Sequence, residues 1–386
     1  MSLPPRPPAG GRRLRRRRNP LLRGVLVAVT VFVFIVGWSL GHALTVPGGG
    51  TLAERVAEWA RSHYMTPLVT FGEWLTYSPP KQGGRPTISV ASGKSAKLKK
   101  EKHYYLNVVP IVPAAIGSPA GAPLAGEGQW SPVEYVHGSP AVFVTKVRES
   151  KVYSSYVAGI VSMDPRLLTF GLRPGVTDPG YANWGVPYYV PQGQRTGLMA
   201  TFNSGFRMNA AEGGFYLNGV HVNSLVNGAA SEVYFKNGTM TIGAWGSNGL
   251  TMSSNVVAVR QNLRLIVING QVPSSVDQNV LSNWGATIGG AYYVWRSGIG
   301  VTADGRIIYV YGPAMDVRTL ADLLKRAGCV SAMELDINPD WMSFMYYNGV
   351  ANPANPSPTN LLPNQFQPAD RYYSLSSRDF TVVYSR

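Results

Sequence analysis

Apolar and polar positions divide this 386-residue chain into two very different parts. From 24 to 44 the sequence GVLVAVTVFVFIVGWSLGHAL contains no Lys, Arg, Asp or Glu over 21 residues. A helix that crosses the hydrocarbon core of a bilayer needs about 20 such residues. The pattern therefore predicts a single transmembrane helix at 24–44, and everything after it follows a different pattern.

A cleaved signal peptide is the alternative for this run. The apolar core of a signal peptide is usually about 7–15 residues long and ends at a site of small residues. The run here is longer, and GHALTVPGGG offers no clean cleavage site, so we expect an uncleaved anchor. Residues 1–23 carry eight arginines and no acid, which predicts a cytoplasmic tail and places the C-terminal bulk outside the membrane.

Hairpin signals dominate the remainder of the chain. Asn-Gly or Asp-Gly pairs stand between apolar runs in FYLNGVHV, VYFKNGTM, LIVINGQV and VTADGRIIYVY. These dipeptides supply the positive φ angles that two-residue hairpin turns require. Further apolar runs at 141–148 and 197–202 predict strands, so a mainly antiparallel sheet is expected.

Two segments have helical periodicity instead. In TLAERVAEWARSHY (51–64), Thr51 and Glu54 have capping-box spacing, which predicts a short amphipathic helix near the bilayer. In DVRTLADLLKRAG, Asp316 can cap the first turn and Gly328 can end the helix. The fold class predicted is α+β: a mainly antiparallel, sheet-rich domain with one or two packed helices, preceded by a single transmembrane helix.

Composition sets the division of the chain into segments. Residues 78–103 are polar and basic, and residues 110–126 are rich in Pro, Ala and Gly, so both read as linkers or long loops. We expect a basic tail at 1–23, a transmembrane anchor at 24–44, a juxtamembrane helix and linker at 45–125, and a compact domain at 126–386.

The net charge of +15 comes largely from the N-terminal tail. Outside residues 1–23 there are 27 basic and 20 acidic residues, an excess of +7. An arginine-rich arm can bind nucleic acid, but here it precedes an apolar span and no aromatic or basic recognition face accompanies it. We therefore expect no nucleic-acid partner, and the mild excess suits anionic wall polymers.

Several kinds of chemistry find no support in the sequence. The five histidines are scattered without metal-ligand spacing, and the single Cys329 permits no intramolecular disulfide. Gly298, Gly300 and Ala303 imitate a dinucleotide fingerprint but lead into a hairpin rather than a helix. No metal and no cofactor are expected, and redox, zinc and serine-hydrolase chemistry are disfavoured.

Two acids interrupt an apolar strand pattern in AMELDINPDW (332–341). On a strand, Glu334 and Asp336 point to the same face with Cα atoms roughly 6.6 Å apart. Two carboxylates this close repel, so one pKa rises, which is the property a general acid needs. Glycosidic bond cleavage uses such a pair. The structural alternative is that one or both acids bind an arginine or loop amides.

Four segments, read in order, resemble the phosphodiester glycosidase family. They are ATFNSGF, GGFYLNG, WRSGIGVTADGRIIYV and the helix followed by AMELD, and the resemblance covers roughly 126–386. The matching positions are Asn203, Gly205, Phe206, Arg296, Gly300, Asp304, Gly305, Leu335 and Asp336. The resemblance implies a glycosidase that acts on a sugar-1-phosphodiester and uses Asp336 as its catalytic carboxylate.

The sequence departs from the family pattern directly after Asp336. The family has glycines and a serine there, whereas this chain has Ile337-Asn338-Pro339-Asp340-Trp341. A glycine-rich turn offers backbone N–H groups to a phosphate, and Pro339 has none to offer. The departure weakens the inference of a phosphodiester substrate and adds a glycan without phosphate, such as one of the cell envelope, as a second candidate.

Site roles follow as hypotheses. Asp336 is the expected nucleophile or base, and Glu334 is the acid or the group that tunes it. Arg296 is expected to hold an anionic group or to pair with Asp336. The other substrate-binding candidates are Asn203, Gly205, Glu212 and Asn338. Trp284, Trp295 and Trp341 could stack on sugar rings or pack in the core, and Asp304-Gly305 is expected to form only a hairpin turn.

Two further function classes stay open. The domain could bind envelope polysaccharide without cleaving it, which the altered loop after Asp336 favours, or it could be a scaffold in a membrane complex. Under every hypothesis the protein is expected at the cell membrane, with its N-terminus in the cytoplasm and its C-terminal domain outside.

Overall fold

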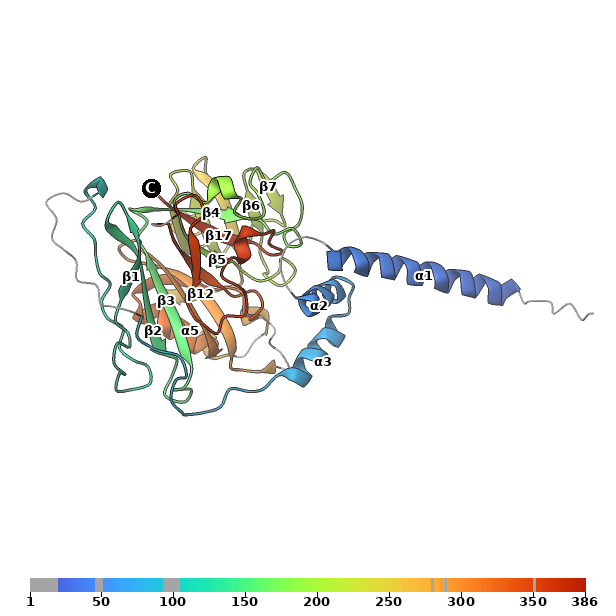
Figure 1. The fold of residues 1–386 in the computed structure, drawn as a ribbon, viewed down its shortest axis with the longest axis horizontal. Coiled ribbons are helices and arrows are strands. Elements are labelled where there is room, and N and C mark those ends of the chain that lie inside the picture. The colour runs from blue at the N-terminus through green and yellow to red at the C-terminus, as the bar shows by residue number, and fades with distance from the viewer. Residues whose placement is uncertain are drawn as a thin grey trace, which may run out of the picture.

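A sheet-rich body with one long projecting helix makes up the molecule (Figure 1). The computed structural model describes residues 20–45, 51–92, 105–278, 281–285, 287, 290–349 and 352–386. All strand pairs among these residues are antiparallel, apart from an isolated parallel bridge between Asp178 and Arg378. The predicted α+β class is confirmed.

The largest sheet has seven strands in the order β1-β2-β3-β13-β12-β14-β11. Their bounds are β1 Ser131–Val136, β2 Ser139–Arg148, β3 Val157–Met163, β11 Leu265–Ile268, β12 Val294–Thr302, β13 Ile307–Met315 and β14 Cys329–Glu334. β2 matches the strand expected at 141–148. Candidate acids Glu334 and Asp336 therefore lie at and just beyond the end of β14, next to β12.

Helix α5 (Val317–Arg326) covers one face of this sheet and confirms the helix predicted there. The Asp316 carboxylate accepts a hydrogen bond from the Thr319 amide (2.7 Å), as expected of an N-cap. Leu320 and Leu324 are fully buried against the sheet, and Gly328 follows the helix at a φ of 92°. The helix stops because only glycine adopts that conformation without strain.

Two five-stranded sheets complete the body, in the orders β16-β15-β5-β17-β4 and β7-β6-β10-β8-β9. The first contains β4 Leu168–Arg173, β5 Leu198–Asn203, β15 Phe344–Asn348, β16 Ser357–Asn360 and β17 Phe380–Ser385. The second contains β6 Phe215–Leu217, β7 Val220–Val222, β8 Ala230–Phe235, β9 Met240–Ala244 and β10 Val256–Gln261. β5 is the strand expected at 197–202.

Three of the four predicted turns join neighbouring antiparallel strands: β6 to β7, β8 to β9 and β12 to β13. At Asn218-Gly219 the φ angles are 49° and 90°, the pattern of a two-residue hairpin. Asn269-Gly270 also turns, but only one bridge, Ile268 to Gln271, follows it. The strand cannot continue because Pro273 has no N–H to donate, and the short helix η3 (Ser274–Asp277) begins there.

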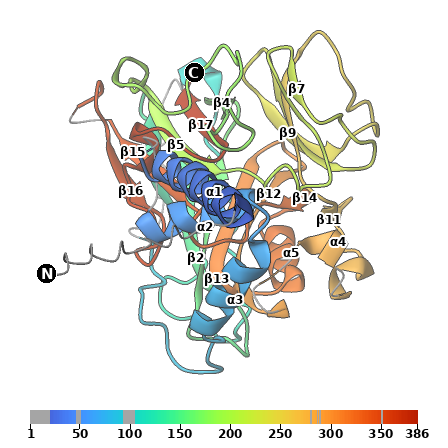
Figure 2. The same cartoon turned by 90° about the vertical axis from the view of Figure 1, so that its right-hand side faces the viewer.

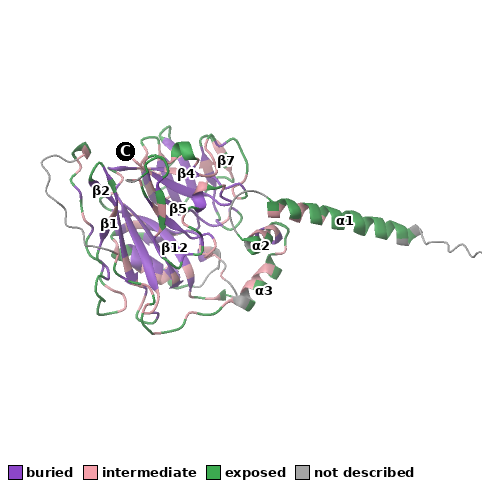
Figure 3. Ribbon diagram, viewed as in Figure 1, coloured by how far each residue is buried: buried purple, intermediate pink, exposed green. Residues whose placement is uncertain are grey.

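The core lies in two layers on either side of the large sheet. Phe202, Tyr309 and Phe344 meet between that sheet and the β5 sheet, with ring centroids 5.2–5.9 Å apart. Ile160, Leu320 and Ala332 belong to the second layer, under α5. Figure 3 shows the strands as the buried part of the molecule and α1 as its exposed part. Polar residues at the end of β14 are consequently enclosed by packed elements.

The N-terminal helices are α1 (Pro20–Thr45), α2 (Leu52–Ser62) and α3 (Thr66–Thr76). Arg23–Thr45 is long and apolar enough to cross a membrane, with a mean hydropathy of 2.3. α2 is the amphipathic helix expected at 51–64, whereas no helix was expected at α3. In Figure 1 α1 extends away from the body, with α2 beside its C-terminal end, and in Figure 2 α1 is seen nearly end-on in front of the body.

The remaining short helices are η1 Tyr105–Asn107, η2 Gln192–Gln194, α4 Leu281–Trp284 and η5 Arg371–Tyr373. Residues before 126 also contact the body: Ile116 is buried, and the Trp130 indole donates to the Ala114 carbonyl (2.8 Å). The predicted division of the chain into segments stays a prediction, as does the role of 1–19, which lie outside the described residues.

Candidate active site

Asp336 is held in place on all sides at the end of β14. Its backbone N–H donates to the Ser204 carbonyl (3.1 Å), and its carbonyl accepts from Ser297 Oγ (2.7 Å). Its carboxylate accepts from the Asn338 amide at Oδ1 (2.9 Å) and pairs with Arg378 Nη2 at Oδ2 (3.1 Å). The side chain is buried and has one fixed orientation.

The environment of Asp336 combines burial with a charged partner. Burial raises the pKa of this carboxyl above its ordinary value, while Arg378 and the Asn338 amide act in the opposite direction. The loop that differs from the family pattern therefore donates its Asn338 amide to the acid itself. Arg378 is the arginine partner of Asp336, a residue that sequence analysis had not singled out.

Glu334 lies two residues before Asp336, at the end of β14, and pairs with a different arginine. Its Oε1 forms an ion pair with Arg296 Nη1, and Arg296 Nε donates to the Met315 carbonyl (3.0 Å). Burial raises the pKa of Glu334 to about 7 despite this partner. Arg296 was expected to hold an anion or pair with Asp336; it instead pairs with Glu334, and its anion-binding role stays a prediction.

Asn203 ends β5 and fixes the loop that follows. Its Oδ1 accepts from Tyr309 Oη (2.6 Å) and the Ser343 amide (3.0 Å), and its Nδ2 donates to Ser297 Oγ (3.1 Å) and the Ser204 carbonyl (3.0 Å). Both ends of the amide are therefore satisfied within the protein. A contact of Asn203 with sugar hydroxyls stays a prediction.

Gly205 lies where two elements approach closely. A Cβ at this position would come within about 3.0–3.1 Å of the Asn262 side chain. Asn262 accepts from the Phe206 amide (3.1 Å) and donates to the Glu334 carbonyl (2.8 Å). The Gly205 carbonyl accepts from Arg378 Nη2 (3.2 Å). This glycine thus allows the loop after β5 to contact the end of β14.

A second group of buried charges adjoins Asp336 and was missed from the sequence. Ser204 Oγ donates to Glu232 Oε2 (2.6 Å), and Arg260 Nε donates to Asp379 Oδ2 (2.6 Å). Burial raises the pKa of Glu232 to about 8, so this carboxyl holds a proton at neutral pH. The signal was present in the sequence: Glu232 and Arg260 interrupt apolar strands, as Glu334 does.

The remaining candidates lie in varied places. Glu212 is exposed at a φ of 49°, and Asn338 closes the turn after Asp336 by accepting from the Asp340 amide (2.9 Å). Trp284 is buried, and its indole donates to the Ser275 and Gln278 carbonyls (3.1 Å each), whereas Trp295 is partly buried against Phe366. Asp304 pairs with Arg306 in the β12–β13 turn, as expected.

Trp341 is the predicted tryptophan nearest to the acid site. It is buried, and the guanidinium groups of Arg371 and Arg378 lie 5.3 and 5.7 Å from its ring centroid. Within the part of the chain that the structure describes, no cluster of three or more His, Cys, Asp or Glu side chains has the arrangement of a metal site.

Comparisons with known proteins address this same region. The sequence profile of the phosphodiester glycosidase family matches residues 196–356 and so confirms the predicted resemblance. That segment contains β5 with its loop, the β12–β13 hairpin, α5 and the end of β14, which are the elements that hold Asn203, Arg296, Glu334 and Asp336. No curated protein matches the chain.

Several solved structures also match part of this chain. The zebrafish N-acetylglucosamine-1-phosphodiester alpha-N-acetylglucosaminidase catalytic domain, auto-inhibited by its pro-peptide, is 15% identical, with a TM-score of 0.41, over 67% of this chain and 87% of that one. A hypothetical protein from Synechocystis is 13% identical (TM-score 0.36; 66% and 64% covered). An exported protein from Burkholderia pseudomallei is 12% identical (TM-score 0.32; 59% and 74%). At such values no residue of these proteins is equated with one here.

Proposed function

Since residues 196–356 match the phosphodiester glycosidase family, we propose that this protein is a membrane-anchored glycoside hydrolase acting outside the cytoplasm. Its substrate class is a sugar-1-phosphodiester or a cell-envelope glycan. The observation that carries the proposal is the carboxylate of Asp336 within the family-matched region, held in one orientation by the Asn338 amide and by Arg378, which lies beyond that region.

Asp336 takes the role of nucleophile or base. A carboxylate attacks an anomeric carbon, or activates a water molecule for that attack, only if it is held in one geometry. The contacts from Arg378, Asn338 and the Ser204 carbonyl supply this geometry from three separate segments of the chain. Asn203, Gly205 and Asn338 then act as positioning residues around the acid.

A proton donor is available from carboxyl groups with a raised pKa. Glu334, at about 7, is the predicted one, and Glu232, at about 8, is a second candidate on the opposite side of the Ser204 loop. The demand for such a donor depends on the leaving group. A phosphate monoester has a second pKa near 6, so it leaves with less help from a general acid than a sugar alcohol does.

Topology completes the proposal. The apolar helix spans Arg23–Thr45, and eight arginines within residues 1–23 precede or begin it. Arginine-rich flanks stay in the cytoplasm, so the catalytic body is directed to the outer side, where envelope glycans are found.

The test compares Asp336→Asn with the wild-type full chain in detergent, on sugar-1-phosphodiesters, aryl glycosides and envelope polysaccharides. We expect the variant to lose at least about 10³-fold in kcat/KM, since removal of an essential carboxylate has effects of this size. Asp304→Asn is the matched control, because Asp304 lies in a hairpin turn with Arg306 and should leave turnover unchanged.

Each outcome of that comparison separates the candidate functions. Diester cleavage lost in Asp336→Asn supports the family chemistry, and cleavage of plain glycosides alone supports a shift away from phosphate. A folded wild-type protein that turns over none of the substrates but binds polysaccharide would overturn the enzyme proposal. That result would favour a binding domain. The loop after Asp336 is consistent with this alternative, because it lacks the glycines of the family pattern and reads Ile337-Asn338-Pro339-Asp340-Trp341.

A further inference from the structure

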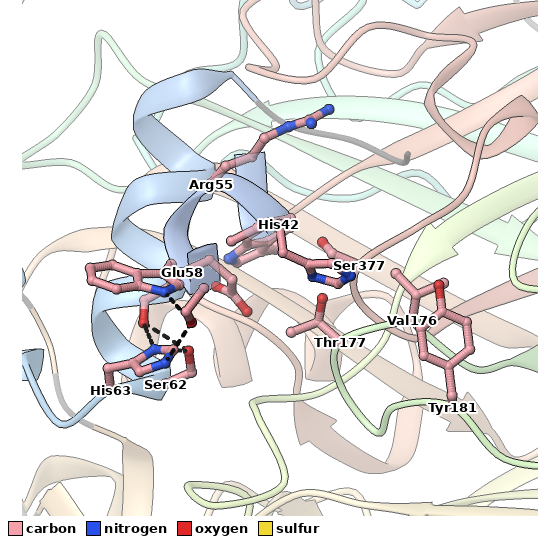
Figure 4. A pocket seen from close by; sticks show the side chains of 13 residues that line it. His42, Arg55, Glu58, Ser62, His63, Val176, Thr177, Tyr181 and Ser377 are labelled. Atoms are coloured by element: carbon pink, nitrogen blue, oxygen red, sulfur yellow. Dashed lines mark hydrogen bonds between the residues drawn. The ribbon is translucent and has the colours of Figure 1, made fainter. Parts of the chain in front are cut away.

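A cavity of about 290 Å³ lies between the N-terminal helices and the catalytic body. Figure 4 shows His42, Glu58 and His63 of the helices on one side and Thr177, Tyr181 and Ser377 on the other. Trp341 also lines it. Ser377 and Trp341 both adjoin Arg378, the partner of Asp336, so the cavity leads toward the candidate active site.

Two arginines of the body lie at this end of the site. Arg207, in the loop that follows β5, forms an ion pair with Glu58 of α2. Arg378 directs Nη2 to Asp336 and to the Gly205 carbonyl, while its Nε is buried without a hydrogen-bond acceptor among the described residues. A buried guanidinium with an unused donor costs free energy unless an anion or water satisfies it.

Glu58 is an unusual neighbour for these arginines, because it comes from a helix outside the family-matched region. The residue is buried, and its Oε1 has no hydrogen-bond partner within the described parts of the chain. Burial acts to lower the pKa of Arg378, but the carboxylates of Asp336, Asp178 and Glu58 raise it overall. The Glu58 carboxylate therefore interacts with Arg207 through an ion pair and with Arg378 through its electric field.

We propose that Arg207 and Arg378 form the subsite for the phosphoryl group of the substrate, and that the Glu58 carboxylate occupies this subsite until the substrate replaces it. The inference rests on the proposed function and names its anion-binding residues. A guanidinium fork matches a phosphate as it matches a carboxylate. One anion can thus exchange for the other without a change in the arginines.

The cavity is the proposed route to the two arginines, because its lining includes Glu58, the partner of Arg207, and Trp341 and Ser377, the neighbours of Arg378. α1 has 26 residues and is therefore roughly 39 Å long, whereas the hydrocarbon core is about 30 Å thick. Counted from Arg23, about 20 residues cross the core, so the outer boundary lies near Ala43, about one turn beyond Ser39, which accepts a hydrogen bond from the Trp59 indole of α2 (3.0 Å). Ser39, His42 and Ala43 line the cavity, so this wall of the cavity lies near the outer boundary of the bilayer core. A phosphodiester on a lipid anchor would lie at this height.

The first experiment measures binding of inorganic phosphate to the full chain in detergent, by titration calorimetry. Glu58→Gln should tighten the dissociation constant at least about fivefold, since phosphate no longer competes with a carboxylate for the same site. Adding Arg207→Gln to Glu58→Gln should abolish that binding. Glu73→Gln is the control, because it removes a carboxylate that pairs with Arg61 between α2 and α3.

Two results would overturn the subsite. One is equal phosphate affinity in the wild type and Glu58→Gln. The other is an equal gain from Glu73→Gln, which would mean that a loosened α2, rather than a vacated anion site, admits phosphate. If the double variant does not fold, Glu58→Gln and Glu73→Gln decide the question by themselves.

Turnover distinguishes the sources of the phosphoryl group. Glu58→Gln should lower KM at least about fivefold for substrates with a phosphodiester and leave KM for plain aryl glycosides unchanged. The two arms of the experiment use a lipid-linked sugar phosphodiester in vesicles and a water-soluble one. If Glu58→Gln lowers KM for the lipid-linked substrate alone, the natural substrate resides in the membrane. Phosphate binding as expected, with no turnover on any substrate, would sustain the subsite and reject the proposed function.

Discussion

Individual buried charges are the most informative residues in this protein. Glu232, Arg260, Glu334 and Asp336 all interrupt apolar strands, and the structure brings all four around the loop after β5. Burying an unpaired charge costs several kcal/mol, so such residues persist only with partners. Each has a hydrogen-bond or ion-pair partner here, which offsets part of that cost.

Glu149 makes a residue-scale prediction on stability against pH. This fully buried carboxyl accepts from the Ala314 amide (2.9 Å), has no hydrogen-bond partner for its Oε1 among the described residues, and its pKa is raised by burial to about 8. The folded state therefore keeps a proton that the unfolded state releases near pH 4.5. The resulting stabilisation is complete below that pH and is lost as pH rises through about 8.

Glu149→Gln should remove this dependence because the amide stays neutral at every pH. We expect the variant to be as stable as wild type near pH 5. By pH 9 it should be more stable by about 2–4 kcal/mol, since one pKa unit corresponds to roughly 1.4 kcal/mol. Urea denaturation at both pH values measures the difference, and parallel pH profiles for the two proteins would show the prediction to be wrong.

At the scale of single elements, a strand can be predicted from the sequence most easily when only one of its faces is buried, because its apolar and polar residues then alternate. β3 is buried at all seven residues because α5 and its layer cover one face and the β5 sheet the other. It has no alternation, and the sequence did not predict it. α5 has one apolar stripe and a cap, and it was predicted correctly at both ends.

Asp316→Ala should destabilise the body by removing the N-cap of α5. The lost hydrogen bond to the Thr319 amide is worth about 1 kcal/mol, which lowers the melting temperature by roughly 2–4 °C in a domain of this size. Asp322→Ala, on the exposed side of the same helix, is the control and should have less than half that effect. Equal losses in a thermal scan would rule out the capping contribution.

At the scale of the whole molecule, the surface of the long apolar helix differs from that of the body. α1 exposes most of its large apolar side chains, and within the described residues it contacts the rest of the chain mainly through α2. Such a surface is suited to lipid, which supports the proposed membrane anchor.

Single cysteines test the orientation. Native Cys329 is buried, and burial raises the pKa of its thiol, so it should contribute little background. Ser247→Cys, on the exposed surface of the body, should react with a membrane-impermeant maleimide in intact cells. Ser2→Cys should react only after permeabilisation. Labelling in the opposite order would place the body in the cytoplasm.

The sequence by itself determined what depends on neighbours along the chain. The transmembrane run, the hairpin turns, the cap of α5 and the family motifs are local patterns of hydrophobicity, backbone conformation and spacing. Asp336 could be selected in this way because an acid in an apolar strand is conspicuous wherever the strand lies.

Only the tertiary structure decided which charges meet. Arg378 pairs with Asp336 because β5 lies beside β17 and its loop reaches the end of β14. Arg296 pairs with Glu334 because β12 lies beside β14. Glu58 reaches Arg207 across the interface between α2 and the body. Ion pairs form through space between elements that are distant in sequence, so no local pattern could have revealed them.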